Sequence, residues 1–109
     1  MTLSTTTSPE GTIVAIDGRI DTTNYLEFEQ VVTDVLDKEV QTLFLDASQL
    51  SYISSSGLRV LLSVQKKMMA SGGSFRLFAL QPGIKEIFDI SGFSAIFSIF
   101  PTIEAAKVG

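Results

Sequence analysis

The N-terminal part of the chain alternates between apolar and polar positions, a pattern typical of β-strands. Residues 12–17 are rich in β-branched side chains and are expected to form a strand that ends at Gly18. Residues 2–8 are expected to form another strand, joined to the strand at 12–17 by a turn at residues 9–11.

From residue 22 the pattern changes to helical spacing, and strands and helices then alternate. Leu26 or Phe28 begins an apolar stripe that continues to residue 36. The expected cap of this helix is Thr22, Thr23 or Asn24. The remaining elements are expected to be a buried strand at 42–46, a helix at 55–70, a strand at 74–80, a short helix at 82–91 with Ile84, Ile87 and Phe88 inward, a strand or extended segment at 96–100, and a last helix after Pro101. This alternation predicts a single α/β domain over residues 1–109, with a mixed sheet of four or five strands and helices mainly on one side.

The helix at 55–70 is amphipathic when its residues are placed at about 100° per residue. Its expected sheet side holds Leu58, Leu61, Leu62, Met68 and Met69, and its polar, basic side holds Ser56, Arg59, Ser63, Lys66 and Lys67. Val60 and Val64 fall on the flank and are expected to be partly exposed, while Gln65 falls within the apolar arc and is expected to bond a neighbouring loop. The whole core is expected to include Val14, Ile16, Val31, Val32, Val35, Leu43, Leu45, Leu58, Leu61, Leu62, Leu77 and Phe88.

Composition narrows the classes of function. The 109 residues contain no cysteine and no histidine, which removes disulfides, thiolate chemistry, the commonest general base and the commonest transition-metal ligand. No cofactor and no metal are therefore expected. The net charge of −4 argues against nucleic acid as the main partner. Without a signal peptide or a long apolar segment, a cytoplasmic protein with no membrane insertion is expected.

Three consecutive serines, Ser54, Ser55 and Ser56, stand at the start of the helix expected at 55–70. A serine is a preferred N-cap, but capping explains one serine rather than three. A helix N-terminus also favours a phosphate, so a serine switched by phosphorylation fits this position. A solvated capping loop explains the serines about equally well on composition alone. Asp46 and Asp21 are more simply explained as carboxylates bonded to nearby amides than as residues with a direct chemical role.

Three blocks of sequence together resemble the STAS domain family, in particular the bacterial anti-sigma-factor antagonists. The blocks are residues 18–21 (GRID), residues 45–58 (from LDAS to YISSSGL), and residues 90–106 (from ISGF to TIEAA). They occur in the order and at the distances usual for the family, and the likeness covers nearly the whole chain.

The resemblance implies a cycle of partner exchange. The unphosphorylated antagonist binds an anti-sigma factor that is also a serine kinase, which frees a sigma factor; phosphorylation of a serine breaks the complex, and a metal-dependent serine phosphatase restores it. The family's target precedes the glycine, which here is Ser56. Ser54 stands where the family often has aspartate, which leaves Ser54 and Ser55 as competing acceptors. The protein is expected to be a monomer or a weak dimer. Its expected partner surface comprises Asp21, Thr22, Ser54, Ser55, Ser56, Arg59, Val60 and Ser63.

Other functions fit the residues less well. Serine hydrolysis requires a base near the nucleophile, and neither histidine nor a Gly-x-Ser-x-Gly motif is present. A two-component receiver would need an acidic pair after its first parallel strand, and residues 17–19 do not supply one. A STAS scaffold in a stress-signalling complex, or a subunit of a lipid-transport complex, stays open as the alternative.

Overall fold

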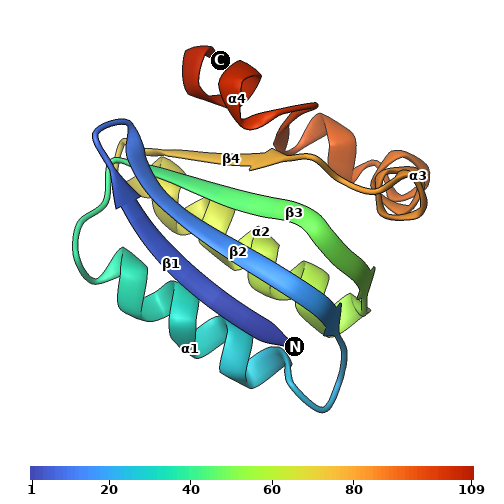
Figure 1. The fold of residues 1–109 in the computed structure, drawn as a ribbon. Helices are drawn as coiled ribbons and strands as arrows, with labels where there is room; N and C mark the ends of the chain where they lie inside the picture. The colour runs from blue at the N-terminus through green and yellow to red at the C-terminus, as the bar shows by residue number, and fades with distance from the viewer.

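A computed structural model describes residues 1–109 and shows a five-stranded sheet whose strands lie in chain order (Figure 1). β1 (Thr2–Ser8) and β2 (Gly11–Ile20) form an antiparallel hairpin at one edge. β2 then pairs in parallel with β3 (Thr42–Ile53), β3 with β4 (Ser74–Phe78), and β4 with β5 (Ser98–Phe100). The sheet is therefore mixed, as the sequence predicts.

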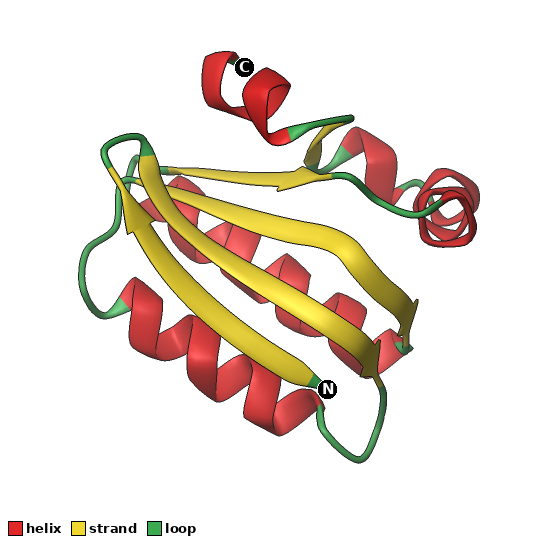
Figure 2. Ribbon diagram, viewed as in Figure 1, coloured by secondary structure: helices red, strands yellow, loops and turns green.

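Helices cover the two faces of the sheet unequally. α1 (Tyr25–Leu36) and α2 (Ser55–Ala70) lie beside each other on one face, whereas the short α4 (Ile103–Val108) lies on the other side of the sheet, at its β4–β5 end (Figures 1 and 2). α3 (Pro82–Ser91) and a 3₁₀ turn at Phe93–Ala95 lie between β4 and β5 in the chain. None of the helices is both long enough and apolar enough to span a bilayer.

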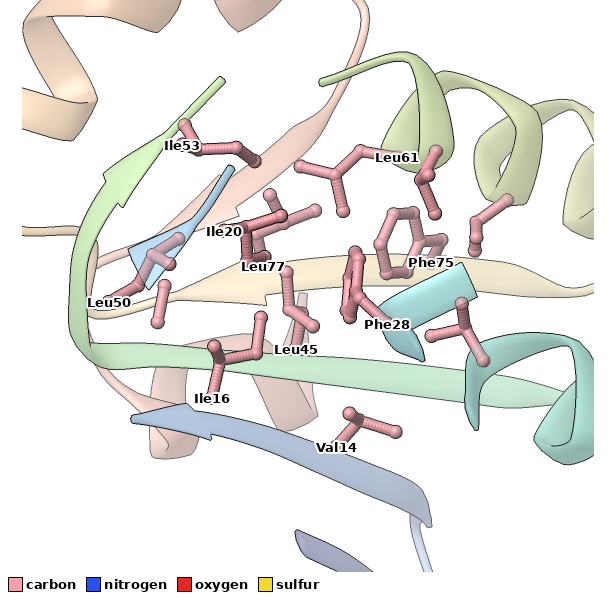
Figure 3. Packing of buried hydrophobic residues seen from close by; sticks show 14 of the residues in the cluster. Val14, Ile16, Ile20, Phe28, Leu45, Leu50, Ile53, Leu61, Phe75 and Leu77 are labelled. Carbon is pink, nitrogen blue, oxygen red and sulfur yellow. The ribbon is translucent and has the colours of Figure 1, made fainter. Parts of the chain in front are cut away.

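The alternation of side chains along β3 builds two separate cores. Leu43 and Leu45 point toward α1 and α2, while Phe44 points to the face that α4 covers. Figure 3 shows the larger core, in which side chains from the sheet, α1 and α2 converge: Val14, Ile16, Ile20, Phe28, Leu45, Leu50, Ile53, Leu61, Phe75 and Leu77. The smaller core is formed by Phe44, Phe78 and Ala106.

Two strands are longer than the sequence pattern predicts. β2 continues through Gly18 to Ile20, and β3 continues beyond Asp46 to Ile53. The pairing of the two strands shifts register before Asp17 and after Gly18, which interrupts the regular alternation without ending the strands. Gly18 has a φ of +111°, a conformation that side chains rarely adopt, so this glycine bends the strand rather than closing it.

Most of the predicted core is buried, but the orientation predicted for α2 is wrong. Val60 and Val64, predicted to be partly exposed, are each 3% exposed. Met69, predicted to face the sheet, is 68% exposed. Leu58 and Leu62 are only partly buried. The predicted orientation allowed only for packing against the sheet. In the structure α2 also packs against α1, and the valines are buried on that side of the helix.

Smaller differences occur elsewhere. Val31 is only partly buried, Phe28 rather than Leu26 is the buried member of the α1 stripe, and Ile87 is half-exposed. The prediction for Gln65 is confirmed, because its Nε2 donates to the carbonyl of Ile96 at 3.2 Å.

Candidate functional site

The candidate site lies where the parallel strands β2 and β3 end at the same edge of the sheet. The two strands pair as far as Ile20 and Ile53. The next residue after β3, Ser54, donates its backbone N–H to the carbonyl of Ile20 at 2.8 Å. This bond joins the end of β2 to the N-cap of α2, so the sequence blocks at 18–21 and 45–58 meet in space.

Ser54 is the N-cap of α2. Its Oγ accepts the N–H of Gly57 at 3.2 Å, and the residue is only 7% exposed. The sequence predicted Ser54 as a partner-binding residue and as a competing phosphorylation site, but a buried hydroxyl engaged in a cap is poorly placed for either role. Serine performs here the capping that an aspartate would also perform.

Gly57 allows α2 to approach the sheet closely. A Cβ at this position would lie 2.7 Å from Cγ1 of Ile53 and 2.8 Å from Cγ2 of Ile20. Both contacts are shorter than carbon atoms normally make, so a side chain here would force the helix or the two isoleucines to shift. Gly57 therefore lets the first turn of α2, with its serines, lie close to the ends of β2 and β3.

Ser56 lies at the head of α2 beside a hollow between the two helices. Tyr25 and Glu29 of α1 and Ser56, Arg59 and Val60 of α2 line this hollow of about 240 Å³. The guanidinium Nη2 of Arg59 donates to Ser56 Oγ at 3.4 Å. Ser56 is half-buried and Ser55 is exposed. Val60 contributes to the floor of the hollow from the core and cannot act as the exposed apolar side chain that the sequence suggested.

The loop between β2 and α1 is held by its own side chains. The Oδ1 atom of Asp21 accepts the hydroxyl of Thr23 at 2.5 Å and the N–H of Thr23 at 2.9 Å. These bonds hold the pKa of Asp21 below its usual value, with the Thr23 hydroxyl as the largest cause. Asp21 is thus bonded to nearby amides, as its sequence position suggests.

Asn24 occupies the N-cap position of α1 but its side chain does not cap the helix. Its Oδ1 accepts the N–H of Asp21, and its Nδ2 donates to the carbonyl of Arg19, both at 2.9 Å. Asn24 therefore ties the loop back to the end of β2 and leaves Thr22 exposed at the surface.

Sequence reasoning missed one pair of residues at this edge. The guanidinium carbon of Arg19 lies 4.3 Å from the ring centre of Tyr52, and Tyr52 is 37% exposed. Arg19 and Tyr52 are partners in the β2–β3 register. The irregular pairing between these strands hides that partnership from the sequence.

The remaining polar and charged residues named from the sequence lie outside this hollow. Asp46 accepts the N–H of Ser48 at 2.9 Å on Oδ1, and the strand alternation places it on the same face as Phe44, away from α2. No group of three or more histidine, cysteine, aspartate or glutamate side chains is arranged to hold a metal ion. Ser63 lies half-buried on α2, and Lys66 and Lys67 are exposed.

Comparison with known proteins gives consistent matches. The STAS domain pattern matches residues 2–106. The chain is 37% identical over 94 residues to a Bordetella bronchiseptica protein named "Putative anti-sigma factor antagonist BtrV", covering 86% of this chain and 81% of that one.

Solved structures share the fold. An anti-sigma factor antagonist from Mycobacterium paratuberculosis has a TM-score of 0.90 at 23% identity, covering 98% of this chain and 91% of that one. The phosphorylated form of SpoIIAA, a Bacillus cell fate determinant, has a TM-score of 0.73 at 19% identity and 98% coverage of both chains. The matched pattern spans both strand ends, the serines and α2, and the chain accordingly belongs to the STAS domain family, among homologues of anti-sigma factor antagonists.

Proposed function

We propose that this protein is an anti-sigma factor antagonist switched by phosphorylation of Ser56. Unphosphorylated, it binds an anti-sigma factor that carries serine kinase activity, and this frees a sigma factor in the cytoplasm. Phosphorylation ends the complex, and a serine phosphatase restores it. The observation that carries the proposal is the position of Ser56, whose hydroxyl lines a surface hollow at the head of α2 while the neighbouring Ser54 is used as the cap.

The chemistry at Ser56 requires only an accessible hydroxyl from this chain. Its Oγ attacks the γ-phosphorus of ATP held by the kinase, the Oγ–P bond forms, and the bond between that phosphorus and the ADP oxygen breaks. The hydroxyl proton passes to a base of the kinase. The first turn of α2 tolerates the product, because free N–H groups and the positive end of the helix dipole favour an anion there.

The surface proposed to bind the partner is smaller than the one expected from the sequence. It comprises Ser55, Ser56, Arg59 and Ser63 of α2 together with Asp21 and Thr22 of the adjoining loop. Ser54 and Val60 are removed from it because both are buried. The hydrogen bond from Ser54 to Ile20 holds the two parts of the surface together, so the surface is formed before binding.

Phosphate mapping tests this function directly. The protein is incubated with ATP and the anti-sigma factor that it binds, and the modified residue is found by mass spectrometry. We expect phosphate on Ser56 in the wild type and in Ser55→Ala, and none in Ser56→Ala. Phosphate on Ser55 alone would move the switch by one residue. No phosphate, with a kinase shown to be active, would favour the scaffold or lipid-transport alternative.

A further inference from the structure

Arg59 is a cation without a carboxylate partner in this chain. The ion pairs of the protein join Lys85 to Asp89 and Lys107 to Glu10, and neither involves Arg59. A guanidinium has five N–H donors. The hydrogen bond of Arg59 to Ser56 uses one of them, at the long distance of 3.4 Å. Most donors of this exposed guanidinium therefore have no partner within the chain and can bind a further group.

The spacing of Ser56 and Arg59 determines what happens when Ser56 is modified. Residues three apart on a helix are surface neighbours, and the guanidinium already reaches Ser56 Oγ. A phosphate on that oxygen would carry about −1.5 to −2 charges within reach of the same donors. Glu29 lines the α1 side of the hollow, and its negative charge would push the phosphate away from α1 and toward Arg59.

We propose that Arg59 is a cation shared between two anions, and this inference rests on the proposed function. In the unphosphorylated protein it pairs with a carboxylate of the anti-sigma factor. In the phosphorylated protein it pairs with the phosphate on Ser56 instead. The partner's carboxylate then loses its cation and faces a phosphate.

The intramolecular anion wins this competition for two reasons. The phosphate is attached three residues from Arg59, so its effective concentration does not depend on the amount of partner. It also carries more charge than a carboxylate and offers three acceptor oxygens to the guanidinium. Phosphorylation thus removes an attraction as well as adding a repulsion, so its effect exceeds that of steric exclusion alone.

The first test needs no partner. Phosphoserine is placed at position 56 by chemical ligation, so that no variant depends on the kinase, and its second pKa is measured by ³¹P NMR. We expect a lower phosphate pKa in the wild type than in Arg59→Gln, by about half a unit or more. Lys66→Gln is the matched control, because it removes the same charge two turns along the same helix face. Equal pKa values in the wild type and Arg59→Gln, or equal shifts in both variants, would overturn the proposal.

The second test measures binding of the unphosphorylated and phosphorylated forms to the anti-sigma factor. We expect Arg59→Gln to weaken the unphosphorylated complex about tenfold or more and to reduce the factor by which phosphorylation weakens it. Lys66→Gln should change neither value. If phosphorylation weakens the wild-type and Arg59→Gln complexes by the same factor, the inference about Arg59 fails and the proposed function stands. If phosphorylation does not weaken even the wild-type complex, the proposed function fails.

Discussion

Gly57 illustrates how a single missing side chain lets α2 begin close to the strand ends. Its Cβ would lie within 2.8 Å of side-chain carbons of both Ile20 and Ile53, which are buried and not free to move aside. Overpacking of this kind costs about 1–3 kcal/mol, while replacing glycine by alanine within a helix gains about 0.8–1.0 kcal/mol. We therefore expect Gly57→Ala to lower the free energy of unfolding by roughly 1 kcal/mol in a urea titration.

Gly83 provides the control for this substitution. It lies in the first turn of α3, and a Cβ there would meet nothing within 4 Å. Gly83→Ala should leave the free energy of unfolding unchanged or raise it. A Gly57→Ala protein as stable as Gly83→Ala would show that α2 can shift away from the strand ends.

Asp21 gives a prediction about pH at the same scale. Its pKa lies below the ordinary 3.8 because the folded loop bonds its ionised form, first through the Thr23 hydroxyl. The folded-state pKa is lower than the unfolded one, so the resulting stabilisation is present above about pH 4 and is lost as the pH falls through the folded-state pKa. Thr23→Val should raise the pKa of Asp21, measured by the NMR shift of its carboxyl carbon.

Asp89 serves as the internal control in that titration. Its pKa is also lowered, by hydrogen bonds from Lys85 and then Ser94, which lie far from Thr23 in the chain. The Asp89 titration should therefore be the same in both proteins. An unchanged pKa of Asp21 in Thr23→Val would contradict the assignment of the hydroxyl as the main cause.

At the scale of the element, α2 shows what its own sequence can and cannot predict. The helix, its start among the serines and its end at Ala70 follow from spacing and capping residues. The buried arc does not follow, because leucines and valines are equally apolar and the position of α1 decides between them. Because of this tertiary packing, Val60 and Val64 are buried in the core and Met69 is exposed. The same limit applies to β2 and β3, which continue three and seven residues beyond their predicted ends because register shifts interrupt the alternation there.

Leu61 and Leu62 test this orientation of α2. Leu61 is fully buried between the helix and the sheet, whereas Leu62 is only partly buried. We expect Leu61→Ala to cost about 2–5 kcal/mol of stability through lost burial and a residual cavity. Leu62→Ala should cost distinctly less in the same denaturant titration. Equal losses would place the two leucines on the sheet side equally, as the helical wheel predicted.

At the scale of the whole molecule, the site is formed by residues that the chain keeps far apart. The segments that carry Asp21 and Ser56 come together because β2 and β3 are parallel neighbours that end at one edge, and a hydrogen bond joins Ser54 to Ile20 there. The family motifs could indicate these residues, and alternating elements could indicate the sheet. The hollow with Tyr25 and Glu29, and the contact of Arg19 with Tyr52, depend on the angle between helices and on strand register, which no local pattern encodes.

The position of Ser56 outside the core leads to a prediction that tests the proposed phosphorylation switch. A negative charge in the first turn of α2 is compatible with the fold, because the helix dipole favours it. We therefore expect Ser56→Asp to keep the melting temperature and far-UV circular dichroism of the wild type while weakening the complex with the anti-sigma factor about tenfold or more. Ser56→Ala should bind whether or not ATP is present, since it cannot be phosphorylated.

Gly83→Asp separates a local effect at the site from a general effect of charge. It introduces the same charge at the corresponding second position of α3, in a place where its side chain meets no other atoms within 4 Å of the Cβ. This variant should bind as tightly as the wild type. Equal weakening by Ser56→Asp and Gly83→Asp would mean that the complex responds to net charge. A Ser56→Asp protein that binds normally would remove Ser56 from the partner surface, because a carboxylate at the head of α2 would then meet nothing in the complex.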